Sequence, residues 1–245
     1  MQSTIYNDLL AVDLSRLSLK ALLNKTALDP SLVDYVTIGT VIQETKTSNI
    51  AREATMGAGI PMSVPSHTVT QACISSNAAI CTAAEKIMAG QADIVIAGGV
   101  ETFSDVPIRY GRKVRQKLIG MPKAMKKGPL TAAKHFFKDL KASDLAPEAP
   151  AIANFTTGEV MGVSSDRLSS KFGVSREEMD HFTVLSHSNA MKAHEEDWYD
   201  GEVVAYKGSN MENGIKASTY EKVRWLGIGW GLVGIAFCLW WVFFC

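Results

Sequence analysis

The stretch HTVTQACISSNAAICTAAEKIMAGQADIVIAGG, residues 67–99, decides the fold that this sequence predicts. It opens with a short β-branched segment at 67–70, and an alanine-rich run from Cys73 to position 89 follows, ended by a glycine. A second apolar, β-branched segment at 93–97 closes on a pair of glycines. A strand, a helix and a strand in so short a span form a βαβ unit, in which a helix covers parallel strands. The stretch therefore predicts an α/β fold with a parallel sheet.

The residues upstream add one more strand and two more helices. Leucine and valine recur at helical spacing over 9–23, which predicts an amphipathic helix. Residues 33–42 are rich in Val, Ile, Thr and Tyr and predict a buried strand. A second helix is expected over 48–57, and both Ser48 and Asn49 are suitable N-caps for it.

The composition excludes several classes of protein. The chain has 245 residues, 25 basic and 25 acidic, and 47% of them are hydrophobic, which is incompatible with a disordered or collagen-like chain. A net charge of zero gives no overall reason to expect nucleic-acid binding. The four cysteines form no CxxC pair, so neither a zinc site nor a disulfide framework is predicted, and a reducing compartment is expected. The first residues resemble neither a signal peptide nor a transit peptide.

Charge is concentrated in two neighbouring segments. Residues 109–141 hold eleven Lys or Arg and one acid, interleaved with apolar side chains. Three interpretations stay open for this basic segment: a solvated face, a surface for an anionic membrane, or, with less support, a nucleic-acid surface. Residues 142–202 reverse the sign, with twelve acids and four bases. Two helices, over 164–172 and 175–197, and a short strand at 202–205 are predicted there.

The last 21 residues, 225–245, contain no charged side chain. As a helix they would be about 31 Å long, close to the thickness of the hydrocarbon core of a bilayer. They predict a C-terminal transmembrane helix, with tryptophans near both ends. The alternatives are a buried core helix or a translated non-coding stretch.

Cys73 is the strongest candidate for chemistry. It follows a predicted strand and is expected to begin a helix, where unpaired N–H groups and the helix dipole stabilise a thiolate nucleophile. Cys81, two turns along the same helix, is expected to face the packing side. A lone cysteine is more commonly a small buried hydrophobe, and that interpretation stays open. His187 and His194 lie on one helical face, but two ligands make no metal site, and His67 is interpreted as a packing residue.

These residues also carry a family resemblance. Thr70-Gln-Ala-Cys73-Ile-Ser-Ser-Asn-Ala-Ala79 resembles the nucleophile region of the thiolases, as does the segment 90–101 that ends Ala-Gly-Gly-Val-Glu101. Further segments fit the same family over residues 9–223: 39–43, 49–52, 161–162, 175–180 and 186–190. Within the family the chain is similar to the long-chain 3-ketoacyl-CoA thiolases that act as β-subunits of a mitochondrial trifunctional complex. Ser76-Asn77 and the long basic segment after Pro107 favour that subtype.

The resemblance implies an acyl-CoA acyltransferase of fatty-acid β-oxidation. Cys73 would take the acyl group as a thioester, and Met161 and Gly162 would contact the substrate. Coenzyme A is then a co-substrate, and neither a bound cofactor nor a metal is implied. The implied partners are a second copy of the chain, paired through the strand before Cys73, or the α-subunit of a trifunctional complex. The implied location is the mitochondrial inner membrane.

The sequence also departs from the family pattern. A thiolase uses a Gly-His-Pro histidine as base and a second cysteine in a Cys-x-Gly-Gly-Gly motif, and these 245 residues contain neither motif. The usual first strand, with its Arg-Thr-Pro-Phe signature, would lie before Met1. We therefore expect a thiolase-like N-terminal core over 1–104, a basic insert and helical loop domain over 105–223, and a transmembrane segment over 225–245. The rival interpretation is a catalytically incomplete, membrane-held binding subunit or an incomplete gene model.

Overall fold

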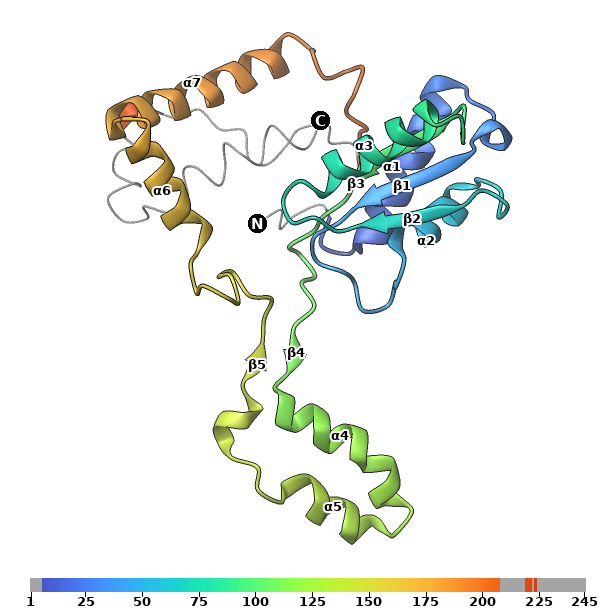
Figure 1. Cartoon of the computed structure of the whole chain (residues 1–245), viewed down its shortest axis with the longest axis vertical. Coiled ribbons are helices and arrows are strands. Elements are labelled where there is room, and N and C mark those ends of the chain that lie inside the picture. Colours follow the sequence, from blue (N-terminus) through green and yellow to red (C-terminus); the bar gives the residue numbers. More distant parts are fainter. Residues whose placement is uncertain (1–5, 208–218, 222, 224–245) are drawn as a thin grey trace. The chain divides into compact units, whose positions relative to one another are not determined.

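The computed structural model describes residues 6–207, 219–221 and 223. The chain divides into two compact units (Figure 1). The residues up to Asp105 and those from Ile152 onward belong to the first unit, and Val106–Ala151 form the second.

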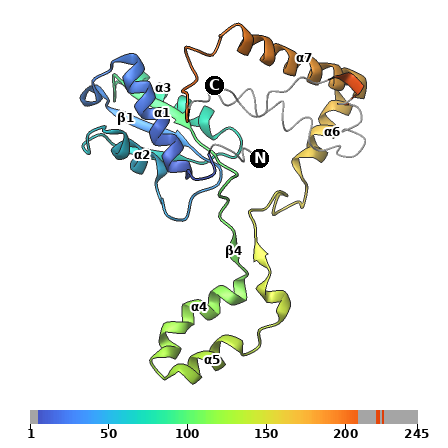
Figure 2. The ribbon, with the colours of Figure 1, turned by 180° about the vertical axis from the view of Figure 1, so that it is seen from behind.

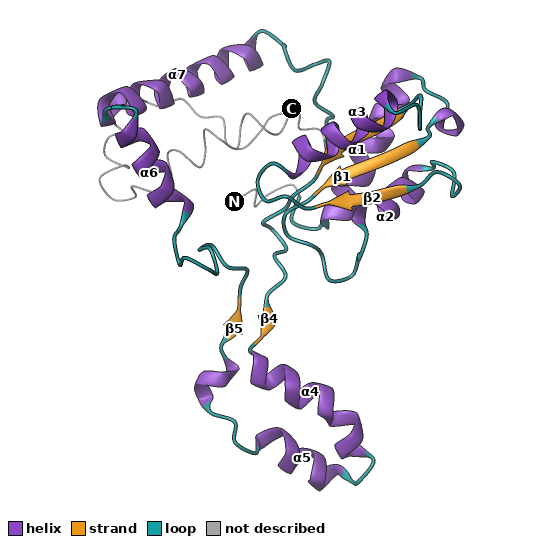
Figure 3. Ribbon diagram, viewed as in Figure 1, coloured by secondary structure: helices purple, strands orange, loops and turns teal. Residues whose placement is uncertain are grey.

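The first unit contains a parallel sheet of three strands, coloured orange in Figure 3. Its strands are β1 (Tyr35–Gly39), β2 (Ser66–Val69) and β3 (Val95–Gly99), in the order β2-β1-β3. Gly39, the last residue of β1, is in register with Val69 of β2 and with Gly99 of β3, so the three carboxyl ends meet at one edge. The predicted parallel sheet is confirmed.

Helices cover both faces of this sheet. α1 (Ala11–Thr26) packs on α2 (Ile50–Ala58), and α2 contacts β1 and β2, whereas α3 (Ser75–Met88) contacts all three strands. The chain moves outward from β1 to β2 and then crosses back over β1 to reach β3. Because parallel crossovers are right-handed, these opposite movements place α2 and α3 on opposite faces, as Figures 1 and 2 show.

The core lies between the sheet and the α1–α2 pair. Val36 and Ile38 of β1 are 0% and 3% exposed, and they pack in one cluster with Ala51 and Ala54 of α2. Leu19 and Leu23 of α1 belong to the same cluster. Asn49 caps α2, because its Oδ1 accepts a hydrogen bond from the Arg52 N–H at 3.2 Å. Of the two N-caps that the sequence allowed, the structure uses Asn49.

Two of the predicted elements differ in the structure. The alanine-rich helix begins at Ser75, two residues later than predicted, because residues 71–74 form a turn. The predicted strand at 202–205 does not form, since no parallel or antiparallel ladder includes these residues. A short 3-10 helix, Pro30–Leu32, was not predicted and follows the cap at Asp29.

The second unit is a helical hairpin closed by a two-stranded ribbon. α4 (Arg112–Met125) packs on α5 (Pro129–Phe137), with Val114, Ala124 and Ala132 buried. A 3-10 helix, Ala142–Leu145, precedes the return strand. The antiparallel strands β4 (Arg109–Tyr110) and β5 (Pro147–Glu148) join the two ends. The basic segment 109–141 therefore forms most of this hairpin.

Glu148 ties the base of the hairpin together. Its carboxylate accepts hydrogen bonds from Arg109 Nε at 3.1 Å, from Arg115 Nη2 at 3.2 Å and from the Arg112 N–H at 3.1 Å. Arg112 is the first residue of α4, so the carboxylate also lies at the positive end of the helix dipole.

The acidic part of the chain forms two helices, α6 (Met161–Lys171) and α7 (Arg176–Glu195). The capping box predicted at Ser175 is confirmed, because Ser175 Oγ accepts from the Glu178 N–H and Glu178 accepts from the Ser175 N–H. In the part of the chain that is described, no helix has both the length and the apolar character needed to cross a membrane. The predicted transmembrane segment 225–245 lies outside the described residues.

Candidate active site

Cys73 lies in the turn between β2 and α3, at the carboxyl edge of the sheet. Its thiol is free and the residue is exposed. The carboxyl ends of β1 and β2 lie side by side at this edge. Ligands of open α/β sheets bind outside the carboxyl ends of the strands. The alternative interpretation of Cys73 as a small buried hydrophobic residue is wrong, because the residue is exposed.

The turn that presents Cys73 is held from within by Ser75. Ser75 is 3% exposed, and its hydroxyl donates to the Ala72 carbonyl at 2.6 Å. The same oxygen accepts from the Gln71 N–H at 2.8 Å. Ala72 has φ of 46°, in the left-handed region that L residues adopt at a cost. Both bonds fix this unfavourable conformation directly before the thiol.

Two glycines allow α3 to approach the sheet at this point. A methyl group on Gly39 would meet the Ser75 backbone, and one on Gly99 would meet the Ser76 side chain. Gly39 and Gly99 are register partners at the ends of β1 and β3. The first turn of α3 therefore packs directly on the backbones of Gly39 and Gly99. This close packing sets the distance between Cys73 and the edge of the sheet.

Cys81 does not face the packing side as the helical spacing suggested. It is exposed on α3, and its thiol donates to Asn77 Oδ1 at 3.7 Å. The buried positions of α3 are instead Ser75, Ala79 and Ala83. The prediction failed because Cys81 is two residues from both Ala79 and Ala83, which places it about 200° around the helix from the buried face.

A carboxylate lies at the same edge as the Cys73 turn. Glu101, two residues after the end of β3, accepts hydrogen bonds from the Val41 N–H at 2.7 Å and from the Ile42 N–H at 3.2 Å. Burial raises the pKa of Glu101 above its ordinary value, although the N–H bonds from Val41, Ile42 and Thr102 oppose that effect.

His67 has the packing role that the sequence suggested. Its Nδ1 lies 3.1 Å from the Tyr35 hydroxyl, and the two rings meet edge to face. Burial, together with the positive charge of Lys86, lowers the pKa of His67. Lys86 Nζ lies 4.2 Å above the centre of the Tyr35 ring. The cluster joins the amino ends of β1 and β2 to α3, at the edge opposite the Cys73 turn.

The two predicted substrate residues, Met161 and Gly162, are the first residues of α6. Met161 is 62% exposed. Within the described residues, no hydrogen bond or ion pair joins either one to the Cys73 turn. Their role toward the substrate stays a prediction.

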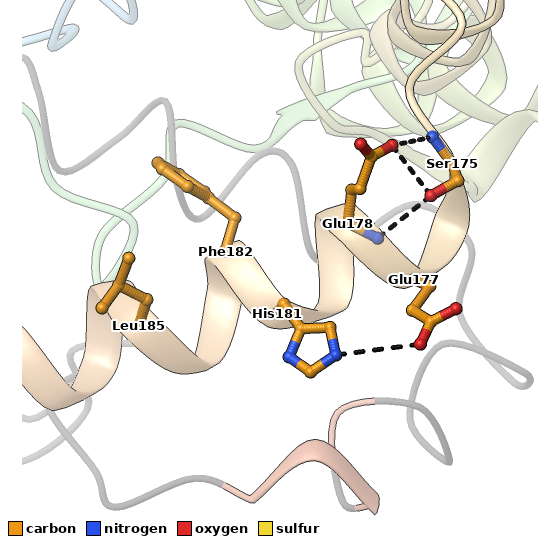
Figure 4. Close-up of a pocket in the computed structure, with 6 residues that line it drawn as sticks. All are labelled: Ser175, Glu177, Glu178, His181, Phe182 and Leu185. Atoms are coloured by element: carbon orange, nitrogen blue, oxygen red, sulfur yellow. Dashed lines mark hydrogen bonds and ion pairs between the residues drawn. The ribbon is translucent and has the colours of Figure 1, made fainter.

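A pocket also lies along the first turns of α7 (Figure 4). Hydrogen bonds from the Ser175 N–H and hydroxyl lower the pKa of Glu178, so this carboxylate serves the helix cap. His181 lies 3.9 Å from Glu177, and its ring stacks on Tyr220 at 4.6 Å between centroids. The charged groups of this pocket thus have structural partners. Its lining consists of Ser175, Glu177, Glu178, His181, Phe182 and Leu185.

Sequence reasoning identified Cys73 but gave no role to Ser75 or Glu101. A serine two residues after a candidate nucleophile is a typical former of hydrogen-bonded turns, and that signal was present. An acid two residues after an apolar strand that ends in a glycine pair was the signal for Glu101. Neither signal specifies the hydrogen-bond partners. Those of Glu101, the Val41 and Ile42 N–H groups, come from a distant part of the chain.

The sequence model of the thiolase N-terminal domain matches residues 1–225. The chain belongs to the thiolase family. The mitochondrial trifunctional enzyme subunit beta of Bos taurus is 44% identical over 228 residues, which cover 91% of this chain and 47% of that protein. A probable 3-ketoacyl-CoA thiolase of Caenorhabditis elegans is 46% identical over 230 residues, 91% of this chain and 50% of the relative. The thiolase chain thus spans about half the length of these two relatives.

The fold of the thiolase family is also found by comparison with solved structures. The Acat5 thiolase from Ascaris suum, determined in complex with coenzyme A, has a TM-score of 0.73 and 22% sequence identity. The match covers 89% of this chain and 52% of the solved one. The thiolase-like α/β fold expected from the resemblance is confirmed.

Proposed function

We propose that this chain carries the acyl-accepting half of a 3-ketoacyl-CoA thiolase, with Cys73 as the nucleophile. The observation that carries the proposal is an exposed thiol in a turn fixed by Ser75, at the carboxyl edge of the sheet. In the step proposed, which starts from a simple acyl-CoA, a bond forms between Cys73 Sγ and the thioester carbonyl carbon while the bond from that carbon to the coenzyme A sulfur breaks. The thiol proton leaves, and the departing coenzyme A thiolate takes up a proton.

The chain by itself is proposed to stop at the acyl-enzyme. Cleavage of a 3-ketoacyl-CoA generates a carbanion that must be protonated, and the family uses the Gly-His-Pro histidine and a second cysteine for proton transfer. The 245 residues contain neither motif. The loss of one general acid or base lowers a rate by about 100- to 10,000-fold. A non-catalytic role as a membrane-held partner subunit is the second candidate function.

The proposed substrate contacts, co-substrate, assembly and location are taken from the thiolase family and the relatives of this chain. Met161 and Gly162 are proposed to contact the acyl-CoA, and coenzyme A is proposed as co-substrate. A homodimer, or a complex with the α-subunit of a trifunctional enzyme, is proposed as the assembly. A mitochondrial location is proposed because the Bos taurus relative is mitochondrial.

Attachment to a membrane is proposed through two segments. In the basic hairpin, Ile119, Leu130 and Phe137 are 81%, 70% and 71% exposed among eleven basic residues, which suits a surface of anionic lipid. The uncharged segment 225–245 is proposed to span the bilayer. Inner-membrane association would follow from both.

The test is exchange of isotope-labelled coenzyme A into acetyl-CoA. This half-reaction needs the acyl-enzyme but forms no carbanion, and it is the kinetic sign of a covalent intermediate. We expect exchange by the full chain, loss of exchange in Cys73→Ala, and retention in the matched control Cys81→Ala. Exchange that survives Cys73→Ala, or a wild-type chain without exchange, would leave only the non-catalytic candidate.

A further inference from the structure

We propose that Glu101 is a positioning residue for the Cys73 turn, acting through the loop that follows β1. The inference rests on the proposed role of Cys73 as nucleophile. It assigns to Glu101 no contact with the substrate and no proton transfer.

Glu101 holds the loop after β1 with a single oxygen. Its Oε2 accepts from the Val41 N–H at 2.7 Å and from the Ile42 N–H at 3.2 Å. The two loop residues precede Glu101 by 60 and 59 positions, so the bonds join the end of β3 to the exit of β1. The Thr102 N–H also stabilises the carboxylate. Without Glu101, the Val41 and Ile42 N–H groups would lose the one carboxylate oxygen that accepts from both of them.

The loop in turn holds the strand that leads to Cys73. The Thr40 N–H donates to the Val69 carbonyl at 3.0 Å, and Val69 is the last residue of β2. Beside it, the Val100 N–H donates to the Gly39 carbonyl at 2.9 Å. Gly39 lies against the Ser75 backbone, whose side chain fixes the turn. A continuous path of backbone bonds and close packing therefore connects Glu101 to the residues on both sides of Cys73.

The chemistry of Glu101 fits a fixed acceptor. Burial raises its pKa, so the carboxylate is kept at this edge at a desolvation cost that surface residues do not have. Because both loop bonds go to one oxygen, a glutamine at this position retains the acceptor, whereas an alanine removes it.

The experiment compares the full chain with Glu101→Gln, Glu101→Ala and the matched control Glu85→Ala, which removes an exposed carboxylate from α3. Amide hydrogen exchange is measured in the segments 40–44 and 70–76. Acetylation of Cys73 by acetyl-CoA and its alkylation by iodoacetamide are measured on the same samples. Alkylation by a small reagent needs an exposed thiol, whereas acyl transfer also needs an aligned one.

For Glu101→Ala we expect exchange at least tenfold faster in both segments and acetylation at least tenfold slower, with alkylation within about twofold of wild type. Glu101→Gln and Glu85→Ala should match wild type in all readouts. Faster exchange confined to 40–44, or a Glu101→Gln variant that behaves as Glu101→Ala, would overturn the proposal. If Glu101→Ala does not fold, Glu101→Asp, which withdraws the carboxylate by one methylene, is judged by the same criteria. A wild-type chain that is not acetylated would refute the proposed function, while the exchange data would still decide the role of Glu101.

Discussion

At the scale of single residues, the reactivity expected of Cys73 depends on neighbours that do no chemistry. The Ser75 hydroxyl donates to the Ala72 carbonyl and accepts from the Gln71 N–H. Gly39 and Gly99 leave room for the first turn of α3, which follows the thiol. A thiol on a mobile loop would have to be oriented during the reaction, whereas this one is oriented by the fold.

A methyl group at Gly39 should destabilise the protein. The new Cβ would collide with the Ser75 backbone, which cannot move without shifting α3. We expect Gly39→Ala to lower the free energy of unfolding by about 1–3 kcal/mol, measured by urea denaturation. Gly98→Ala is the matched control, because nothing lies within 4 Å of the Cβ it would add. Equal losses in the two variants would contradict the packing account.

Asp34 should stabilise the fold in a pH-dependent way. Hydrogen bonds from the Ile94 and Asp93 N–H groups hold the pKa of Asp34 below the ordinary value of 3.8. Its contribution is present above the unfolded pKa and is lost as the pH falls through the folded pKa. The stability difference between wild type and Asp34→Asn should therefore be larger at neutral pH than in strong acid, as measured by urea midpoints. Asp93→Asn, which leaves the backbone donors in place, should show no such change.

At the scale of elements, local signals predicted which elements form better than where they begin. The βαβ unit followed from β-branched and alanine-rich segments, and the capping box at Ser175 followed from spacing alone. The start of α3 was misplaced because alanine-rich periodicity does not show that Ser75 bonds back to Gln71 and Ala72. For the candidate site, the sequence predicted Cys73, with Met161 and Gly162 as substrate contacts, but not the residues that hold the Cys73 turn, since Gly39 and Gly99 come from β1 and β3.

Asn49 is expected to stabilise the fold by more than a residue that only caps α2. Besides accepting from the Arg52 N–H, its Oδ1 accepts from Thr68 Oγ1 at 2.8 Å, and its Nδ2 donates to the Ser66 carbonyl at 3.1 Å. We expect Asn49→Ala to cost about 1–2 kcal/mol in unfolding free energy, and Asn49→Asp, which keeps the acceptor, to cost less. The alternative cap residue offers the control, because Ser48→Ala should be nearly neutral. A larger loss from Ser48→Ala would show that the cap is misassigned.

At the scale of the whole molecule, the chain combines a thiolase core with two segments, the basic hairpin and residues 225–245, for which we propose contact with a membrane. The basic hairpin holds eleven basic residues and one acid, a net charge of +10, over residues 109–141. The core could be recognised from the sequence because its motifs are specific, whereas charge and hydropathy alone do not identify the surface that a segment meets.

The basic hairpin should bind anionic vesicles more than neutral ones. We expect flotation of a tail-deleted chain with phosphatidylserine vesicles at low salt and release at high salt, because salt screens exposed charges. Ile119→Ser should weaken binding by removing an exposed apolar side chain, while the equally basic surface remains. Equal flotation with neutral vesicles would contradict the electrostatic account.

The segment 225–245 should anchor the expressed chain. We expect the full chain to stay in the membrane pellet after carbonate extraction and to move to the supernatant when these residues are deleted. A Lys placed at the centre of the span would cost about 3 kcal/mol and should weaken insertion. Recovery of the full chain in the supernatant would contradict a spanning helix.

The acyl group on Cys73 is the most direct test of the central claim. The purified chain is incubated with acetyl-CoA, digested, and its peptides are analysed by tandem mass spectrometry. The account predicts one acetyl thioester per chain, on Cys73 and not on Cys81, which is also exposed, and its removal by hydroxylamine. An acetyl group found on both cysteines alike, or on neither, would contradict the assignment of Cys73 as the nucleophile.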